Sequence, residues 1–148
     1  MVTGEKRQLL DLILDELVPP SADGRIPGAG EAGVAEFLPS SESYVPKPLD
    51  AVNSVLSSVS AKSADFSALD RTERVSVLKA VEADKPESFE TLVRLTYMGY
   101  YSQPGIRPLF GVGAHPVHPE GYAVERESDE LLAELTKSVR SRGSNYRA

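Results

Sequence analysis

The chain is organised around residues 92–122, which read LVRLTYMGYYSQPGIRPLFGVGAHPVHPEGY. The first part has the apolar spacing of a helix and ends in a tyrosine cluster at Tyr97, Tyr100 and Tyr101. The part that follows Tyr97 contains five glycines and four prolines, a composition that disfavours both helix and strand. We therefore predict a helix end followed by an irregular segment, which either packs on the core or contacts a partner.

The residues before this stretch have helical patterns. The leucine-rich stripe of residues 9–17 predicts a first helix over residues 1–18, which ends at Pro19-Pro20. Asp70 and Glu73 have the spacing of a capping box ahead of another helix. Further helices are expected at residues 31–38 and 48–60, from Pro86 into the central stretch, and at 128–140.

No segment alternates apolar and polar residues for long enough to require a strand. We therefore predict an all-α fold, a single-domain irregular bundle of about five to six helices over residues 1–148. The last helix, residues 128–140, begins with acids and ends with bases, an order that complements the helix dipole.

Composition excludes several classes of protein. The formal net charge of −6 argues against nucleic acid or anionic lipid as the main partner. No apolar run approaches the length of a membrane-spanning helix, so direct membrane insertion is not expected. The absence of cysteine removes disulfides, thiol catalysis and iron–sulfur clusters.

Two motifs in the sequence imitate functional sites. Residues 28–33 spell G-x-G-x-x-G, but no strand precedes them, so we interpret them as a flexible helix start rather than a dinucleotide site. His115 and His118 have the spacing of a metal pair, but each is followed by proline and no clear third ligand is nearby. We expect neither motif to bind a cofactor or metal.

We expect no catalytic residues in this chain. Asp11, Asp15 and Glu16 form carboxylate pairs in the first helix, but we place them on its solvated side. The tyrosine cluster allows two readings: core aromatics, or a docking surface that offers a large rigid area. We expect Tyr97 to be a core residue, because it lies deeper in the helix than Tyr101.

Four segments resemble the gluconate 2-dehydrogenase subunit 3 family, the gamma or small subunit. They are LLDLILDELVPP, PGAGEAGVAEFL, FSALDRTERVSVLKAVEADKPESFETLV and LTYMGYYSQPGIRPLFGVGAHPVHPEGY, which together span residues 9–122. The resemblance implies a non-catalytic subunit that binds, stabilises or helps to mature a flavin-dependent dehydrogenase of the glucose–methanol–choline class. It implies FAD in that large subunit, a sugar or polyol as its substrate and, in some complexes, a cytochrome c subunit.

Carried onto this sequence, the resemblance implies a partner-binding surface at Tyr97, Tyr100, Tyr101, Leu109, Phe110, Gly121 and Tyr122, the predicted contact set. We expect two departures from the exported members of the family: no twin-arginine leader in the chain as written, and an extra helix at residues 128–140. The expected location is cytoplasmic for the chain as written, and periplasmic if a leader has been removed. The alternatives are a small helical enzyme or ligand-binding protein that uses the Tyr/His-rich segment, or a self-associating helical protein.

Overall fold

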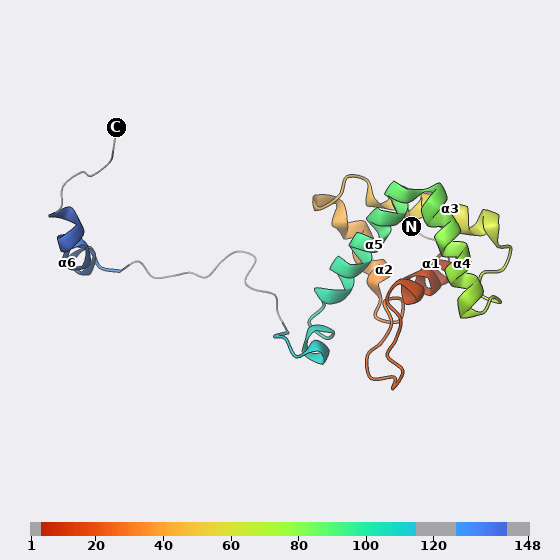
Figure 1. The fold of residues 1–148 in the computed structure, drawn as a ribbon, viewed down its shortest axis with the longest axis horizontal. Coiled ribbons are helices and arrows are strands. Elements are labelled where there is room, and N and C mark those ends of the chain that lie inside the picture. Colours follow the sequence, from red (N-terminus) through yellow and green to blue (C-terminus); the bar gives the residue numbers. More distant parts are fainter. Residues whose placement is uncertain (1–3, 115–126, 142–148) are drawn as a thin grey trace. The chain divides into compact units, whose positions relative to one another are not determined.

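The computed structural model describes residues 4–114 and 127–141, and its backbone contacts divide the chain into two units, residues 1–116 and 117–148. The elements are α1 (Gly4–Leu17), α2 (Val34–Phe37), the 3-10 helix η1 (Leu38–Ser43), α3 (Pro48–Lys62), α4 (Arg71–Asp84), α5 (Pro86–Tyr101), the 3-10 helix η2 (Arg107–Phe110) and α6 (Asp129–Arg140) (Figure 1). The described residues contain no strand, so the predicted all-α class is confirmed. The assignment of residues 1–148 to one domain stays a prediction.

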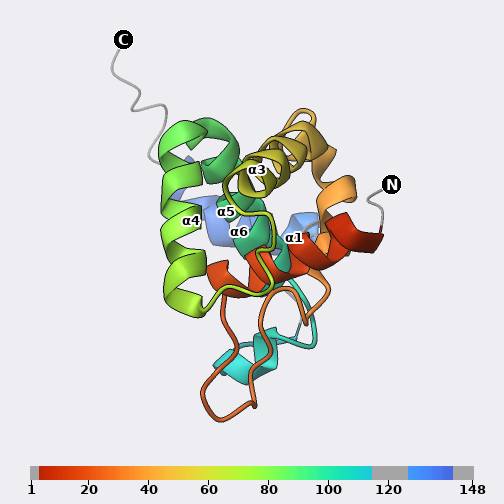
Figure 2. The same cartoon turned by 90° about the vertical axis from the view of Figure 1, so that its right-hand side faces the viewer.

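Helix α5 is the centre of the first unit. It contacts α1, α2, η1, α3 and α4 (Figure 2). Pro86 lies in its first turn. Backbone N–H groups there have no hydrogen-bond acceptor within the helix, so a proline, which lacks an N–H, costs no hydrogen bond. Gly99 allows α2 to approach α5 closely, because a Cβ at this position would lie 2.6 Å from a ring carbon of Phe37. The packing of α2 on α5 therefore depends on a glycine in the last turn of α5.

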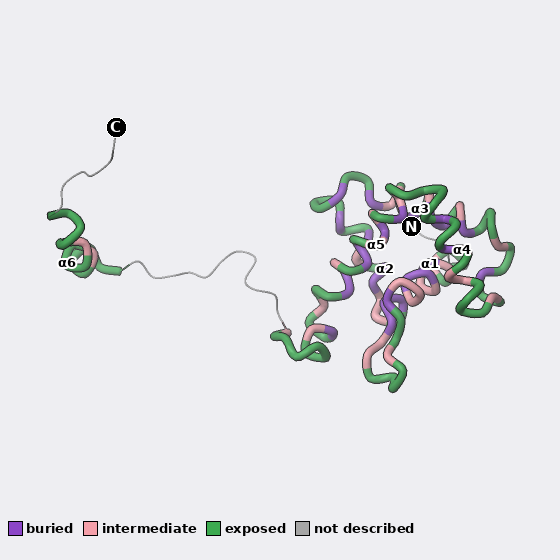
Figure 3. The backbone as a smooth tube through the Cα atoms, viewed as in Figure 1, coloured by how far each residue is buried: buried purple, intermediate pink, exposed green. Residues whose placement is uncertain are grey.

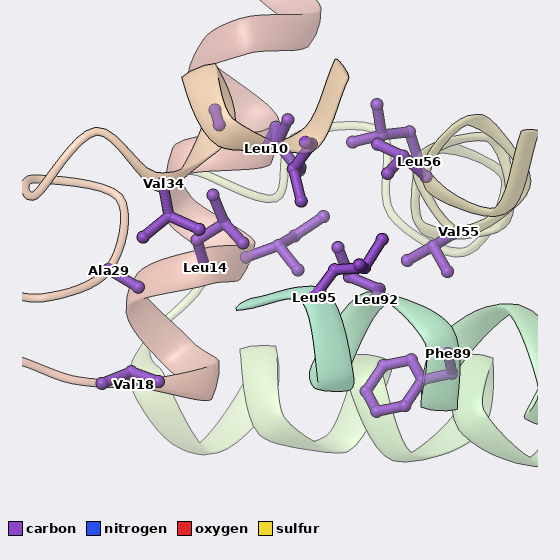
Figure 4. Packing of buried hydrophobic residues seen from close by; sticks show 14 of the residues in the cluster. Leu10, Leu14, Val18, Ala29, Val34, Val55, Leu56, Phe89, Leu92 and Leu95 are labelled. Carbon is purple, nitrogen blue, oxygen red and sulfur yellow. The ribbon is translucent and has the colours of Figure 1, made fainter. Parts of the chain in front are cut away.

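The buried core runs from Leu10 to Ile106, and buried positions recur along α1 to α5 (Figure 3). In Figure 4 the side chains of Leu92 and Leu95 lie between those of Leu14 in α1 and Val55 in α3. Each fully buried leucine stabilises the fold by roughly 1.5–3 kcal/mol relative to an exposed one. The apolar stripe predicted for the first helix is confirmed, because α1 buries Leu10, Ile13 and Leu14.

The helix ends follow the sequence signals. The Asp70 carboxylate accepts a hydrogen bond of 2.9 Å from the Glu73 N–H, and the Glu73 carboxylate accepts one of 2.9 Å from the Asp70 N–H. These reciprocal bonds are the predicted capping box of α4. Ser128 caps α6 through a bond from the Leu131 N–H. None of the helices in the described ranges has the length and apolar character needed to span a bilayer.

The loop that carries the G-x-G-x-x-G pattern packs closely on α1. Gly28 and Gly30 are buried, and a Cβ at Gly30 would lie 2.2 Å from the backbone oxygen of Asp11. The Asp15 carboxylate fixes the loop, because it accepts hydrogen bonds from the N–H groups of Gly30 (2.8 Å) and Glu31 (3.3 Å). The segment leads into α2 as expected, but it is fixed on α1 rather than flexible. Gly30 permits contact with the α1 backbone, and Gly28 lies against the side chains of Asp15 and Pro20.

Two further expectations need correction. The helix predicted at residues 31–38 begins only at Val34, because Gly33 has a left-handed φ of 74° that interrupts helical geometry. Glu16 does not lie on a solvated face, since its side chain is 9% exposed. It pairs with Arg71 at 3.6 Å and Arg74 at 3.4 Å, and both arginines belong to α4.

Candidate partner-binding surface

The end of α5 places its three tyrosines in two different environments. Tyr100 is fully buried, whereas Tyr97 is 46% and Tyr101 is 44% exposed. At 3.6 residues per turn, Tyr100 falls on the same side of the helix as the buried residues Leu92 and Thr96. Tyr97 and Tyr101, four residues apart, share the neighbouring exposed side. The expectation that Tyr97 is a core residue is therefore wrong, and the core tyrosine is Tyr100.

Tyr100 anchors the loop that follows α1. Its hydroxyl donates a hydrogen bond of 2.6 Å to the backbone oxygen of Pro27. Burial raises the pKa of the Tyr100 hydroxyl, and the charges of Tyr101, Asp15 and Glu31 raise it further. The hydroxyl therefore keeps its proton and remains a hydrogen-bond donor. Because its side chain is buried, Tyr100 supports the surface from below and is not an exposed contact residue, although it belonged to the predicted contact set.

The 3-10 helix η2 adds a second aromatic element beside α5. The predicted irregular segment thus contains one short regular turn, which buried Ile106 ties to the core. The Phe110 ring lies 5.4 Å from the Tyr101 ring and 6.5 Å from the Tyr100 ring, both in edge-on geometry. The Arg107 guanidinium donates hydrogen bonds to the backbone oxygens of Gly113 (2.8 Å) and Tyr101 (3.4 Å). These contacts hold Phe110 next to Tyr101.

Tyr97, Tyr101 and Phe110 form the aromatic ridge, with their rings in contact along the chain. Each of the three side chains is almost half exposed. Edge-on and tilted packing restricts the rotation of the rings, so little side-chain entropy remains to be lost when another surface covers them. The ridge is therefore a preorganised apolar surface.

An open groove lies on each side of the ridge. The loop groove, about 280 Å³, is lined by Leu17, Val18, Pro19, Ser21, Ile26, Tyr97, Tyr100, Tyr101 and Phe110. The helix groove, about 290 Å³, is lined by Phe37, Tyr44, Tyr97, Met98, Tyr101, Ser102 and Arg107. Figure 2 shows η2 next to the loop after α1. Residues of both segments line the loop groove. Tyr97 and Tyr101 form a wall of both grooves.

The structure brings together part of the predicted contact set. Tyr97, Tyr101, Leu109 and Phe110 are exposed near the end of α5. Gly121 and Tyr122 lie outside the described residues, as do His115 and His118.

Sequence reasoning missed Tyr44, which is 60% exposed, lines the helix groove and has its ring 6.5 Å from Phe37. It also missed Pro19 and Ile26 of the loop groove. Tyr44 follows a serine-rich stretch with no periodicity, so its position gave no sequence signal. The double proline at residues 19–20 was visible only as a helix stop.

No three histidine, cysteine, aspartate or glutamate side chains within residues 4–114 and 127–141 gather closely enough to hold a metal ion.

The surface around the ridge has few formal charges, and the one charged residue lining either groove is Arg107. The two grooves can therefore bind a partner through apolar contacts, with tyrosine and serine hydroxyls available for hydrogen bonds.

Fold and surface define an all-α protein with an exposed aromatic ridge at the end of its central helix. The chain belongs to the gluconate 2-dehydrogenase subunit 3 family, because the model of that family matches residues 4–107. No significant match was found among curated proteins or among solved structures. The matched range includes Tyr97 and Tyr101, whereas Leu109, Phe110 and α6 lie beyond it.

Proposed function

We propose that this chain is a non-catalytic small subunit that binds and stabilises the large subunit of a flavin-dependent sugar or polyol dehydrogenase. Membership of the subunit 3 family supports an accessory role in a dehydrogenase complex. The observation that carries the proposal is the aromatic ridge, which keeps three large rings at the surface of an otherwise well-buried helical core. FAD and the oxidation chemistry belong to the partner.

The mechanism is the burial of apolar surface. Side chains of the large subunit fill the loop groove and the helix groove, and the wall formed by Tyr97 and Tyr101 lies between them. Interface energy is concentrated in a few aromatic anchors, each worth about 2 kcal/mol or more on truncation. Tyr101 is the strongest candidate anchor, because it contacts three aromatic rings and both grooves.

Co-purification with the large subunit tests this proposal. The tagged full-length chain is expressed in its native organism, and the eluted complex is examined for a flavin absorbance spectrum and a large partner. Tyr101→Ala and Phe110→Ala are each expected to raise the Kd for the flavoprotein by about tenfold or more, since 1.4 kcal/mol corresponds to a factor of ten in Kd. Less flavoprotein should therefore be recovered with these variants. They should also lower the soluble yield of the co-expressed large subunit.

Val75→Ala is the matched control. Val75 is a partly buried apolar residue on α4, and it lines neither groove. This variant should recover as much flavoprotein as the wild type. Equal recovery by Tyr101→Ala, Phe110→Ala and the wild type would show that the ridge is not the contact surface. A wild-type chain that recovers no flavoprotein would contradict the proposed function itself.

A further inference from the structure

A further cleft, apart from the aromatic ridge, lies between the first half of α1 and the end of α3. Residues of these two helices and of the loop between α3 and α4 line it. Figure 2 shows that loop passing in front of α1. We call it the serine cleft, because Ser60, Ser63 and Ser67 are among its lining residues. Its volume of about 290 Å³ is at the lower end of the range for ligand pockets, so it has room for a side chain rather than a cofactor.

Part of the serine cleft is apolar, and its loop side is fixed. Leu9 and Leu12 line the cleft and are only partly buried, whereas Phe66, which also lines it, is buried. The Arg74 guanidinium donates hydrogen bonds to the backbone oxygens of Phe66 (3.2 Å) and Ser67 (2.9 Å). The loop therefore holds its position on the cleft without help from a partner.

The charged residues that line the serine cleft are both acids, Glu5 and Asp65. Oδ1 of Asp65 accepts hydrogen bonds from the Ser67 hydroxyl (2.6 Å), the Ser67 N–H (3.1 Å) and the Ala68 N–H (3.2 Å). The bond from the Ser67 hydroxyl does most to lower the pKa of the Asp65 carboxyl, so this group is ionised at neutral pH. Among the described residues, neither Oδ2 of Asp65 nor the Glu5 carboxylate has a hydrogen-bond or ion-pair partner.

No cation of the described residues neutralises these two acids from within the cleft, because no lysine or arginine lines it. Lys62 pairs with Asp84 of α4, and Arg74 pairs with Glu16 of α1. The C-terminal end of α3 adds a partial negative charge to the cleft. The N-terminal end of α1 adds a partial positive charge of about one half, which is less than the charge of one carboxylate. The serine cleft is therefore negative.

We propose that the serine cleft receives a lysine or arginine side chain of the large subunit, an inference that rests on the proposed function. Such a side chain has an aliphatic stem, which covers Leu9 and Leu12, and a charged end, which pairs with Glu5 and Asp65. The serine hydroxyls accept hydrogen bonds from its remaining N–H groups. Charge and apolar contact thus match the same occupant.

One partner can reach both the serine cleft and the loop groove, because both are lined by residues of α1. Leu12 of the cleft and Leu17 of the groove are five residues apart, which is about 7.5 Å along the helix axis. A standard interface covers about 800 Å² on each partner. The basic side chain therefore adds a charged contact to an interface that is otherwise apolar.

NMR titration of the full-length chain alone tests the chemistry of the serine cleft. The probe is the amide of N-acetylarginine, and its control is the amide of N-acetylcitrulline, which has nearly the same shape without the charge. The arginine probe is expected to shift the backbone amide resonances of Ser63, Asp65 and Ser67 with a Kd in the millimolar range. The citrulline probe should bind about tenfold more weakly. Equal shifts with both probes, or no shift with the arginine probe, would overturn the proposal.

A pair of matched variants connects the cleft to the large subunit. The test variant carries Glu5→Gln and Asp65→Asn, and the amide at position 65 still accepts the hydrogen bonds of the loop. The control variant carries Glu82→Gln and Glu90→Gln, the same change of net charge at two exposed acids that do not line the cleft. The test variant should lose probe binding, and its Kd for the purified flavoprotein should rise about tenfold or more. The control variant should match the wild type in both measurements.

The outcomes separate this inference from the proposed function. If the wild type recovers flavoprotein and the test variant binds it as tightly as the control variant does, the cleft is not a contact site and the proposed function stands. A wild type that recovers no flavoprotein would contradict the proposed function, and with it the partner assigned to the cleft. A dimer of the chain alone that is lost in the test variant would assign the cleft to a second copy and overturn the large-subunit partner.

Discussion

Adjacent tyrosines at the end of α5 have opposite surroundings. Tyr100 is fully buried and bonded to Pro27, whereas Tyr101 is almost half exposed on the ridge. Tyr100→Ala is expected to lower the free energy of unfolding by about 3–5 kcal/mol, because it leaves a large cavity. Tyr101→Ala should lower it by about 1 kcal/mol or less, because its ring loses only partial burial. Urea unfolding followed by circular dichroism compares the two, and equal losses would contradict this assignment.

The raised pKa of Tyr100 gives a pH dependence with a definite sign. Above about pH 10 the unfolded chain releases the tyrosine proton, while the folded chain still holds it. The free energy of unfolding therefore falls as pH rises through this range. Tyr100→Phe loses the hydrogen bond to Pro27 but also loses this titration. Its deficit relative to the wild type should be largest near pH 7 and shrink above pH 10 in denaturant titrations, and a constant deficit would contradict the prediction.

Gly30 tests the close contact between the loop and α1. Gly30→Ala should destabilise the fold by about 1–3 kcal/mol, because the added methyl would overlap the Asp11 backbone and force a shift. Gly105→Ala is the control, since a Cβ at that position would meet no atom within 4 Å. Thermal unfolding measures both variants. A Gly30→Ala midpoint equal to that of Gly105→Ala would show that the loop can move away from α1 at little cost.

Predictions from sequence at the residue scale succeeded where spacing alone determines the answer. The stripe containing Leu10 and Leu14 and the capping box of α4 needed only local patterns. The exposures of Tyr97 and Tyr100 were assigned wrongly, because a helix with tyrosines at i, i+3 and i+4 can turn any of them inward. Tyr100 turns inward to a hydrogen-bond partner, Pro27, that lies 73 residues away in the sequence.

At the scale of the element, the leucines in the apolar stripe of α1 are not all buried to the same extent. Leu14 is fully buried, while Leu17 is only partly buried and lines the loop groove. Leu14→Ala should lower the free energy of unfolding by about 2–5 kcal/mol, and Leu17→Ala should cost less. Denaturant titration of both variants provides the measurement. A larger loss for Leu17→Ala would mean that the helix is rotated from the position described here.

The polar side of α1 was the least predictable part of that element. Asp15 and Glu16 were expected to face solvent, but Asp15 holds the loop at Gly30 and Glu16 pairs with arginines of α4. Arg74 lies 58 residues beyond Glu16, and no local pattern connects them. Helical spacing predicts which residues leave the core, but it does not reveal a second element that covers them.

At the scale of the whole molecule, the buried core cluster among the described residues runs from Leu10 to Ile106. A chain ending at Ala114 should therefore unfold cooperatively with nearly the midpoint of the full-length protein, within about 2 °C. Differential scanning calorimetry of both chains measures this. A midpoint lower by 10 °C or more would show that the residues after 114 contribute to the stability of the core.

The class of fold was predictable for the whole molecule, because helical stripes, prolines and caps are local signals. The candidate surface was predictable only in part. Tyr101 and Phe110 were predicted as contact residues from the resemblance to the subunit 3 family, but the two grooves also need Pro19, Ile26 and Tyr44, which come from other parts of the chain. A surface assembled from distant segments has no contiguous pattern in the sequence.

The central position of α5 has a consequence for synthesis of the protein on the ribosome. The apolar side of α1 emerges first, but Leu92 and Leu95, which cover it, are about 80 residues later in the chain. At about 5–20 residues per second, the nascent chain exposes this leucine-rich segment for several seconds. Chaperones that bind apolar nascent segments would meet α1 during that interval, and release would follow once α5 has left the exit tunnel.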